Sequence, residues 1–301
     1  MKKLDLEKMN LFVSSTFFKD GTPLDQALED CKKHGIFNIE LGSNHSYSHL
    51  FDSVVSSFNF NYLVHNYFPI PQKSFVLNLA STDANILTRS IQHVYKAIDF
   101  CETSGALLYT FHPGFLTDPK GPNQTNQNYD FQWDDAVIRN GKEHKTAFHN
   151  MLLSIEKCVT YAAKKGVRVA IETEGSFTKQ QHLLMQRPEE YEELLRYYGA
   201  TDLGINLNIG HLLLAKNAFK FEVDLFMEIV ENHIVAMELS HNNGRQDQHL
   251  PLLENGWYWP IILNPKYQKA FKILEFRETS ISDVNKSLEL FKTKHQTMYE
   301  S

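Results

Sequence analysis

Histidines and carboxylates recur in this sequence at one kind of position, at or just beyond the end of a short apolar run. Seven of them share it: His65, His112, Glu172, His211, Asp247, His249 and Glu275. Imidazole nitrogens and carboxylate oxygens are ligands of Zn²⁺, Mn²⁺ and Fe²⁺. A buried charged group also needs a partner or a metal ion to offset its desolvation. The pattern predicts a metal site, with one ion or several, at one end of a repeated architecture.

The segment Asp247-Gln248-His249 is the most metal-like local motif. Alternate residues of an extended segment point to the same side, so Asp247 and His249 can hold one ion. Asn208 and His211 form a second motif, NIGH, in which the first residue can point inward while the second caps the strand end. A lone histidine in such a place is more often a hydrogen-bonded core residue. Repetition at several strand ends favours shared ligation.

Two glutamates are candidates for proton transfer. Glu172 in VAIETEG and Glu275 in KILEFRE each lie one step past an apolar run. A carboxylate at a strand end can bind a metal or exchange a proton with a substrate. The alternative for either residue is an ion pair with a lysine or arginine of a helix. Their occurrence on two different strands favours the site.

Eight apolar runs alternate with segments of helical period, which predicts parallel strands with right-handed crossovers. The strands are expected at 10–16, 38–42, 61–67, 107–112, 167–173, 203–209, 233–240 and 270–276, and the helices at 25–35, 83–105, 147–166, 188–199, 219–232 and 282–295. We expect a single (β/α)₈ TIM barrel over residues 1–301. An open doubly wound sheet would want a glycine-rich turn after its first strand, and residues 16–24 do not supply one.

Two long polar stretches, 115–141 and 242–256, follow predicted strands. They would lie on the carboxyl-terminal face of the barrel, where barrel enzymes place their active sites. Loops of this length are usually functional or mobile. The stretch 243–268 is expected to be mostly irregular with one short helix. The loops and the ligand-type residues therefore point to the same face.

Composition excludes some classes of protein. The chain has 301 residues, 42% of them hydrophobic, and a net charge of −6, so no global basic field attracts nucleic acid, although a local basic groove stays possible. Its three cysteines form no CxxC pair, which favours buried thiols over disulfides or thiolate metal ligands. No stretch approaches the length of a membrane span, and the amino terminus lacks the apolar core of a signal peptide. We therefore expect a cytoplasmic protein.

The residue order H…HPG…IE…NxxH…DxH…E, with the segment HNYFPIPQKSFVLNLAS, resembles the xylose-isomerase-like TIM-barrel superfamily. This group includes sugar and sugar phosphate isomerases and epimerases, and also endonuclease IV. The resemblance covers nearly the whole chain. Its motifs are collectively specific for the superfamily and less so for any one activity.

Resemblance to the endonuclease IV branch implies three ions. His65, His112 and Glu172 would hold the first, Glu172, Asn208, Glu238 and Glu275 the second, and His211, Asp247 and His249 the third. The family has aspartate in place of Asn208 and histidine in place of Glu238, and it has aspartate in place of His241. The formal ligand charge is unchanged, because one carboxylate is lost and another gained. We therefore expect the second position to survive with altered geometry, with decay of the site as the alternative.

The isomerase and epimerase branch implies one ion, surrounded by Glu172, Asn208, Glu238 and Glu275. Resemblance to this branch makes Glu172 and Glu275 the catalytic pair that moves a proton through an ene-diolate. Tyr67 and Phe68 could stack on a sugar, with ordinary barrel packing as the alternative. His241 and Arg245 are further candidates for substrate contact. The expected cofactor is one to three ions of zinc or manganese.

Two other functions stay open. A metal-dependent phosphoester hydrolase would act on abasic DNA or a small phosphate ester. The family's GEG turn is absent after Asp247-Gln248-His249, and the loops offer few cations for DNA: Lys19, Lys73, Lys120 and Arg245. Nucleic acid is therefore an unfavoured partner. The remaining possibility is a non-catalytic barrel that binds a sugar.

Overall fold

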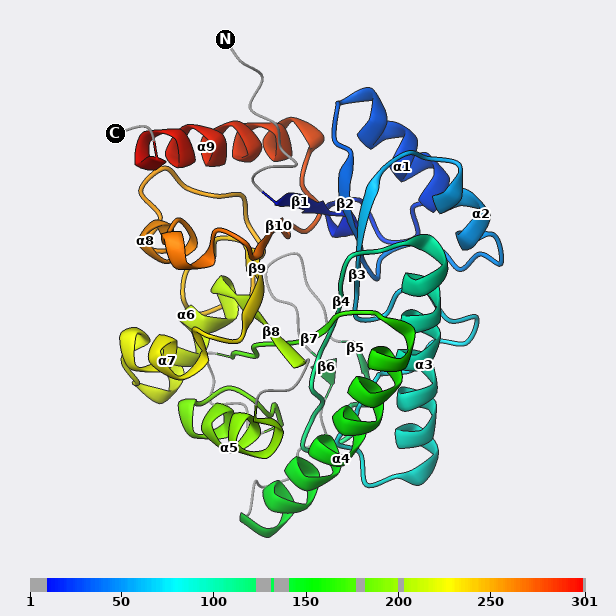
Figure 1. Ribbon diagram of the computed structural model, residues 1–301, viewed down its shortest axis with the longest axis vertical. Coiled ribbons are helices and arrows are strands. Elements are labelled where there is room, and N and C mark those ends of the chain that lie inside the picture. The colour runs from blue at the N-terminus through cyan, green and yellow to red at the C-terminus, as the bar shows by residue number, and fades with distance from the viewer. Residues whose placement is uncertain (1–9, 123–130, 133–140, 177–181, 200–202, 300–301) are drawn as a thin grey trace.

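The eight apolar runs form eight parallel strands that close into a barrel (Figure 1). The computed structural model describes residues 10–122, 131–132, 141–176, 182–199 and 203–299. The strands are β1 (Leu11–Ser14), β2 (Asn38–Leu41), β3 (Asn61–His65), β4 (Tyr109–Phe111), β7 (Val169–Glu172), β8 (Leu203–Asn208), β9 (Ile234–Leu239) and β10 (Phe271–Leu274). Around the barrel they follow the order of the chain, and β10 pairs with β1 to close it. The prediction of a (β/α)₈ barrel is confirmed.

Helices surround the barrel on its outside (Figure 1). They are α1 (Leu24–Lys33), α2 (Phe51–Ser56), α3 (Ala84–Ser104), α4 (Gly141–Lys165), α5 (Pro188–Tyr198), α6 (Ile209–Phe219), α7 (Val223–Val230), α8 (Trp259–Ile262) and α9 (Ile281–Tyr299). Short 3₁₀ turns cover Ser15–Phe17 and Pro265–Tyr267. The predicted helices correspond to α1, α3, α4, α5, α7 and α9, and α8 is the short helix expected in 243–268.

Helices α2 and α6 do not have the pattern from which helices are predicted. Helix α2 has only six residues. Helix α6 follows β8 without a break and buries residues on nearly every side, from Ile209 to Ala218. A helix without a solvated face lacks the amphipathic period. For this reason the sequence predicts a strand over 203–209, whereas β8 ends at Asn208 and helix α6 begins at Ile209.

Alternation along the strands separates the barrel interior into layers. Its apolar layer contains Phe12, Leu63, Leu108, Ala170, Ala236, Phe271 and Ile273. A polar residue follows two positions later in the same strand or just beyond it, and therefore lies on the same face. These residues are Ser14, His65, Thr110, Glu172, Glu238 and Glu275. The intervening residues, such as Val64 and Ile171, pack between the strands and the helices. The same period of two that closes the apolar core thus places a polar layer at the carboxyl-terminal end.

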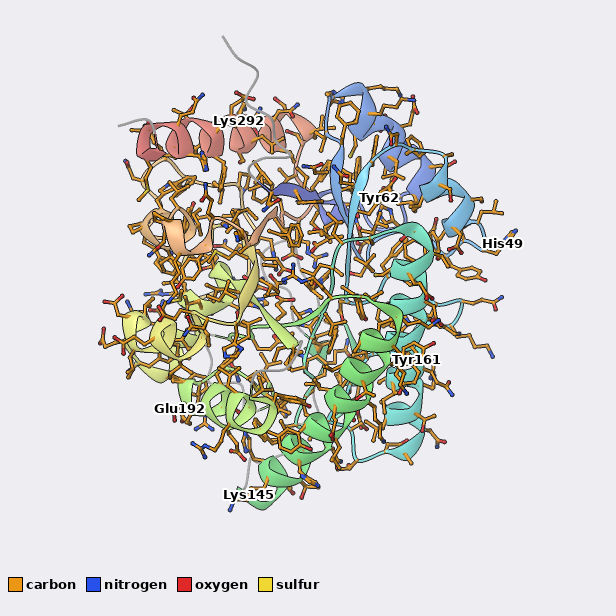
Figure 2. All side chains as sticks on the ribbon, viewed as in Figure 1. His49, Tyr62, Lys145, Tyr161, Glu192 and Lys292 are labelled. Carbon is orange, nitrogen blue, oxygen red and sulfur yellow. The ribbon has the colours of Figure 1, made fainter. Side chains whose placement is uncertain are left out.

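Polar side chains outside this layer point mostly to solvent. Exposed Lys145 and Glu192 project from the helices, whereas Tyr62 is buried between the barrel and its helical shell (Figure 2). Cys31, Cys101 and Cys158 are buried free thiols, as expected. Within the described ranges, no helix combines the length and the apolar character that crossing a membrane would need.

The described parts of the two long loops follow β4 and β9, at the carboxyl-terminal end of the barrel. In the first, β5 (Gly121–Pro122) pairs antiparallel with β6 (Phe131–Gln132). Residues 123–130 and 133–140 of the predicted 115–141 loop lie outside the described residues. In the second loop, His241 forms an isolated antiparallel bridge with Leu250, which closes the segment 242–249 between them.

Asp83 caps helix α3, the helix that follows β3. Its Oδ1 accepts hydrogen bonds from the backbone N–H groups of Asn85 (2.8 Å) and Ile86 (3.1 Å). We expect Asp83→Ala to lower the free energy of unfolding by about 1 kcal/mol, because two orphan amides lose their acceptor. Asp25→Ala is the matched control, since Asp25 lies in the first turn of α1, where no side chain caps the helix. Urea denaturation of both variants measures the difference, and equal losses would contradict the cap.

Candidate metal centre

A cavity of about 840 Å³ opens at the carboxyl-terminal end of the barrel. All seven strand-end residues of the opening pattern line it: His65, His112, Glu172, His211, Asp247, His249 and Glu275. Asn208 and Glu238 do not line the cavity and are fully buried, at 0% and 1% exposure. The seven residues that match the resemblance therefore reach the cavity, and the two that depart from it lie among the side chains beneath.

The first cluster is formed by His65, His112 and Glu172. Glu172 Oε2 lies 3.7 Å from His65 Nε2 and 3.4 Å from His112 Nε2. Two ligands of a tetrahedral ion bonded at roughly 2.1 Å are about 3.4 Å apart. The three donor atoms are thus spaced as ligands of one ion would be.

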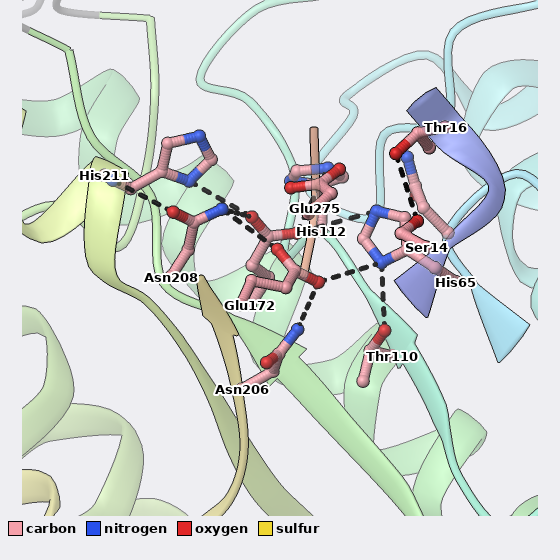
Figure 3. A network of polar contacts seen from close by, with 12 residues as sticks. Ser14, Thr16, His65, Thr110, His112, Glu172, Asn206, Asn208, His211 and Glu275 are labelled. Atoms are coloured by element: carbon pink, nitrogen blue, oxygen red, sulfur yellow. Dashed lines mark hydrogen bonds and ion pairs between the residues drawn. The ribbon is translucent and has the colours of Figure 1, made fainter. Parts of the chain in front are cut away.

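The other ring nitrogens of these histidines are held from behind. His65 Nδ1 lies 2.9 Å from Thr110 Oγ1 (Figure 3). His112 Nδ1–H donates to Glu174 Oε1 at 2.6 Å. Metal-binding histidines are usually oriented in this way by a partner on the second nitrogen. Sequence reasoning missed Glu174, although its place two residues after Glu172 indicates the same face of an extended segment.

The second cluster repeats this arrangement with His211, Asp247 and His249. Asp247 Oδ2 lies 3.3 Å from His211 Nε2 and 2.9 Å from His249 Nε2. His211 Nδ1–H donates to the backbone carbonyl of Thr173 at 2.8 Å, and His249 Nδ1 lies 3.2 Å from Glu275 Oε2. Both clusters therefore consist of two Nε2 atoms that face one carboxylate oxygen.

The electrostatics favour positive charge at His112 and His249, one histidine of each cluster, whereas burial lowers the pKa of His65 to about 4. Burial alone would lower the pKa of His112, but Glu172 and Glu174 outweigh it and raise that pKa to about 9. Asp247 and Glu275 likewise raise the pKa of His249 to about 9 against the effect of burial. Surroundings that favour protonated imidazoles also favour a divalent cation in their place.

One orphaned atom supports the same fit. Glu172 Oε2 is buried, and in the part of the chain that the structure describes it has no hydrogen-bond partner, although it faces two imidazoles. A buried carboxylate oxygen without a donor is costly unless a cation or proton satisfies it. By donor type, spacing and charge, both histidine clusters fit a metal ion.

The residues expected around a central, second ion are arranged differently. Asn208 turns its amide N–H groups, not its oxygen, toward Glu172 and Glu238. Glu275 pairs instead with His249 and, at 3.3 Å, with Arg277 Nη2. This set does not fit a metal ion as the two histidine clusters do.

Glu40 of β2 joins the polar layer although the sequence analysis did not select it. Its carboxylate lies with His65 and Glu238 in a group whose donor atoms are all within 4.8 Å of one another. Among the described residues neither Glu40 oxygen has a well-formed hydrogen bond. Burial and the charge of Glu275 raise the pKa of Glu40 well above its usual range, against a smaller effect of the Ser14 hydroxyl. The sequence feature that could have identified Glu40 is a glutamate between apolar residues of the strand segment NIEL.

The four residues expected to contact substrate fall into two groups. Tyr67 and Arg245 line the cavity. Phe68 is fully buried and packs its ring against Phe51, so it is not placed to stack on a sugar. Its contacts are the barrel packing that was the alternative.

His241 also lies away from the cavity walls. It pairs with Leu250 through the backbone, and its ring lies 6.4 Å from that of Tyr258. Arg89 of α3 and Arg277 line the cavity and were not selected from the sequence. These two arginines can be identified as cavity residues only from the tertiary structure, because their local sequence contains no motif that predicts it.

Comparison with known proteins finds relatives that share the barrel fold. An uncharacterized protein of Methanocaldococcus jannaschii is 21% identical over 217 residues, which cover 72% of this chain and 66% of that protein, slightly less than two thirds of it. A crystal structure of a D-tagatose 3-epimerase-like protein matches with a TM-score of 0.69 at 20% identity, covering 96% of this chain and 98% of the other. Endonuclease IV from Thermus thermophilus matches with a TM-score of 0.60 at 13% identity, covering 97% and 99%.

These structural likenesses show a shared fold. The family model described as xylose isomerase-like TIM barrel matches residues 28–298. Its match extends from the first helix to the last, and so includes every residue of both histidine clusters. The chain belongs to the xylose isomerase-like TIM barrel family.

Proposed function

We propose that this chain is a divalent-metal-dependent enzyme that isomerises or epimerises a sugar or sugar phosphate. The observation that carries the proposal is the entry of two carboxylates, Glu172 from β7 and Glu275 from just beyond β10, into one cavity beside two metal-type clusters. The family includes sugar isomerases and epimerases, which supports the same conclusion.

The two histidine clusters would hold the metal. Their nitrogen and oxygen donors suit Zn²⁺ or Mn²⁺. A divalent ion held there would act as a Lewis acid on a substrate carbonyl and a neighbouring hydroxyl. The metal-binding residues are His65, His112 and Glu172 in one cluster, and His211, Asp247 and His249 in the other.

Glu275 and Glu172 would move the proton. His249 and Arg277 hold the pKa of Glu275 at about 2 against the effect of burial, so this carboxylate is ionised at neutral pH and able to accept a proton. Removal of the proton beside the carbonyl by Glu275 would leave an ene-diolate and a protonated Glu275, and a proton that Glu172 takes up from solvent would be delivered to carbon to complete the exchange. Return to the neighbouring carbon gives an isomer, and return to the opposite face gives an epimer.

The cavity walls favour a small substrate with an anionic group. Arg89 and Arg245 are exposed side chains that line the cavity, and guanidinium groups bind phosphate well. A volume of about 840 Å³ suits a sugar phosphate. The chain carries a net charge of −6, which disfavours a long polyanion such as the DNA backbone as a ligand.

The second candidate is hydrolysis of a small phosphate ester. The repetition of the histidine cluster favours it, because two ions can stabilise the attacking and the leaving oxygen of one displacement. Glu172 links the two clusters, since its Oε1 lies 3.1 Å from His211 Nδ1 while its Oε2 faces the first cluster. This candidate requires release of inorganic phosphate and no exchange of a carbon-bound proton.

One experiment distinguishes these activities. Protein loaded with Mn²⁺ or Zn²⁺ is incubated in D₂O with a panel of aldoses, ketoses and their phosphates, and followed by NMR and a phosphate assay. We expect deuterium beside the carbonyl and a new isomer or epimer, without phosphate release. Phosphate release without exchange would replace the proposal with hydrolysis. Tight sugar binding with neither reaction would indicate a non-catalytic barrel.

A further inference from the structure

The carboxamide of Asn208 lies between two buried carboxylates beneath the cavity. Its Nδ2 donates to Glu172 Oε1 and to Glu238 Oε2, each at 2.9 Å. Its Oδ1 accepts the backbone N–H of His211 at 3.1 Å and so caps helix α6 (Figure 3). The opposite orientation would set the oxygen against two carboxylates and the NH₂ group against a backbone N–H. The partners therefore determine which end of the amide is nitrogen.

The neighbouring carboxylate is satisfied in the same manner. Asn206 Nδ2 donates to Glu238 Oε1 at 2.6 Å, so each oxygen of Glu238 accepts one amide N–H. An amide nitrogen has no lone pair to offer a metal ion. Asn208 therefore supplies hydrogen-bond donors at the place where facing carboxylates would otherwise need a cation or a proton.

We propose that the Asn208 amide takes the place of a metal ion between Glu172 and Glu238. The centre then holds its ions in the two histidine clusters and none between them. This inference rests on the metal dependence proposed above. It makes Asn208 a positioning residue, because its N–H group holds Glu172 Oε1 while Glu172 Oε2 is turned toward His65 and His112.

The substitution Asn208→Asp tests this role. It removes both N–H donors and adds a carboxylate, so that Glu172, Glu238 and the new carboxylate face one another and need a cation. Wild-type protein and N208D are saturated with Mn²⁺, desalted, and analysed for metal by mass spectrometry. We expect two ions per wild-type chain and three per N208D chain. Asn206→Asp is the matched control, since among the described residues the Asn206 amide donates only to Glu238, and we expect the variant to bind two ions.

The location of the ions is tested independently by anomalous scattering from Mn²⁺-soaked wild-type crystals. We expect peaks in the two histidine clusters and none between Glu172 and Glu238. A peak between those carboxylates would overturn the proposal. An unchanged metal count in N208D would also overturn it, provided that circular dichroism shows the variant folded. If N208D does not fold, the wild-type map decides.

Failure of the proposed function has a different outcome. Wild-type protein without any bound ion would contradict metal dependence itself. The role of Asn208 is still decided in that case by whether N208D binds one ion more than the wild type does.

Discussion

Replacement of Glu172 by glutamine is expected to lower kcat/KM by about 10³-fold or more. Glu172 Oε2 lies 3.7 Å from His65 Nε2 and 3.4 Å from His112 Nε2. Its Oε1 accepts a hydrogen bond from the side-chain N–H of Asn208. Glutamine keeps the shape but removes the charge that attracts a cation to these imidazoles. It also removes a group that can carry a proton. Both effects act on the same step, and steady-state kinetics on the substrate identified by deuterium exchange measures them.

Glu174→Gln is the control for this variant. Glu174 has the same charge, lies two residues away and contacts His112 Nδ1 at 2.6 Å, behind the cluster. Loss of such an orienting partner typically costs roughly 10–100-fold in activity or metal affinity. We therefore expect the loss in E174Q to be clearly smaller. A folded E172Q variant within tenfold of wild-type activity would remove Glu172 from the mechanism.

The second large effect is expected from Asp247→Asn. Asp247 Oδ2 is the oxygen that His211 Nε2 and His249 Nε2 both face. The neutral amide leaves two imidazoles without their shared anion, so the second cluster should lose its ion. We expect one bound ion fewer per chain and a fall in kcat/KM of about 10²-fold or more, because an ion contributes several kcal/mol to charge stabilisation. Metal analysis and kinetics on one preparation measure both quantities.

Asp20→Asn is the matched control for D247N. Asp20 also lines the cavity, but its side chain is exposed at the rim. The same change of charge there should leave the metal count unaltered and change kcat/KM by less than about threefold, since exposed charges are screened by water. Equal losses in the two variants would show that general cavity charge, not the Asp247 cluster, is responsible.

The order of elements and the position of the site follow from local patterns in the sequence. A period of two places His65, Glu172 and Glu275 two residues after apolar interior side chains, and the repeated alternation with helices leads to a parallel barrel. Both patterns involve residues close together in the chain, so they can be recognised in a single sequence. Helix α6 was not predicted, because it is buried on nearly every side and has no amphipathic period.

The grouping of the ligands depends on the register of strands that are far apart in the chain. Glu172 pairs in register with Asn206, and Asn208 pairs with Glu238. This register brings the Asn208 amide between two carboxylates, where the count of ligand charges alone had suggested a metal position of altered geometry. It also places Glu238 beneath the cavity with Glu40, a residue that the sequence offered only as one polar position in a strand.

The sequence by itself determined that seven metal-type side chains would lie at or beyond the ends of strands, at one mouth of a barrel. That conclusion needs only residue types and periodicity. The tertiary structure alone decided which oxygen each imidazole faces and that Phe68 and His241 turn away from the cavity. It also decided that Asn208 presents nitrogen and not oxygen to its neighbours. Those outcomes depend on distances of a few ångströms between side chains from different strands, which closure and register of the barrel set.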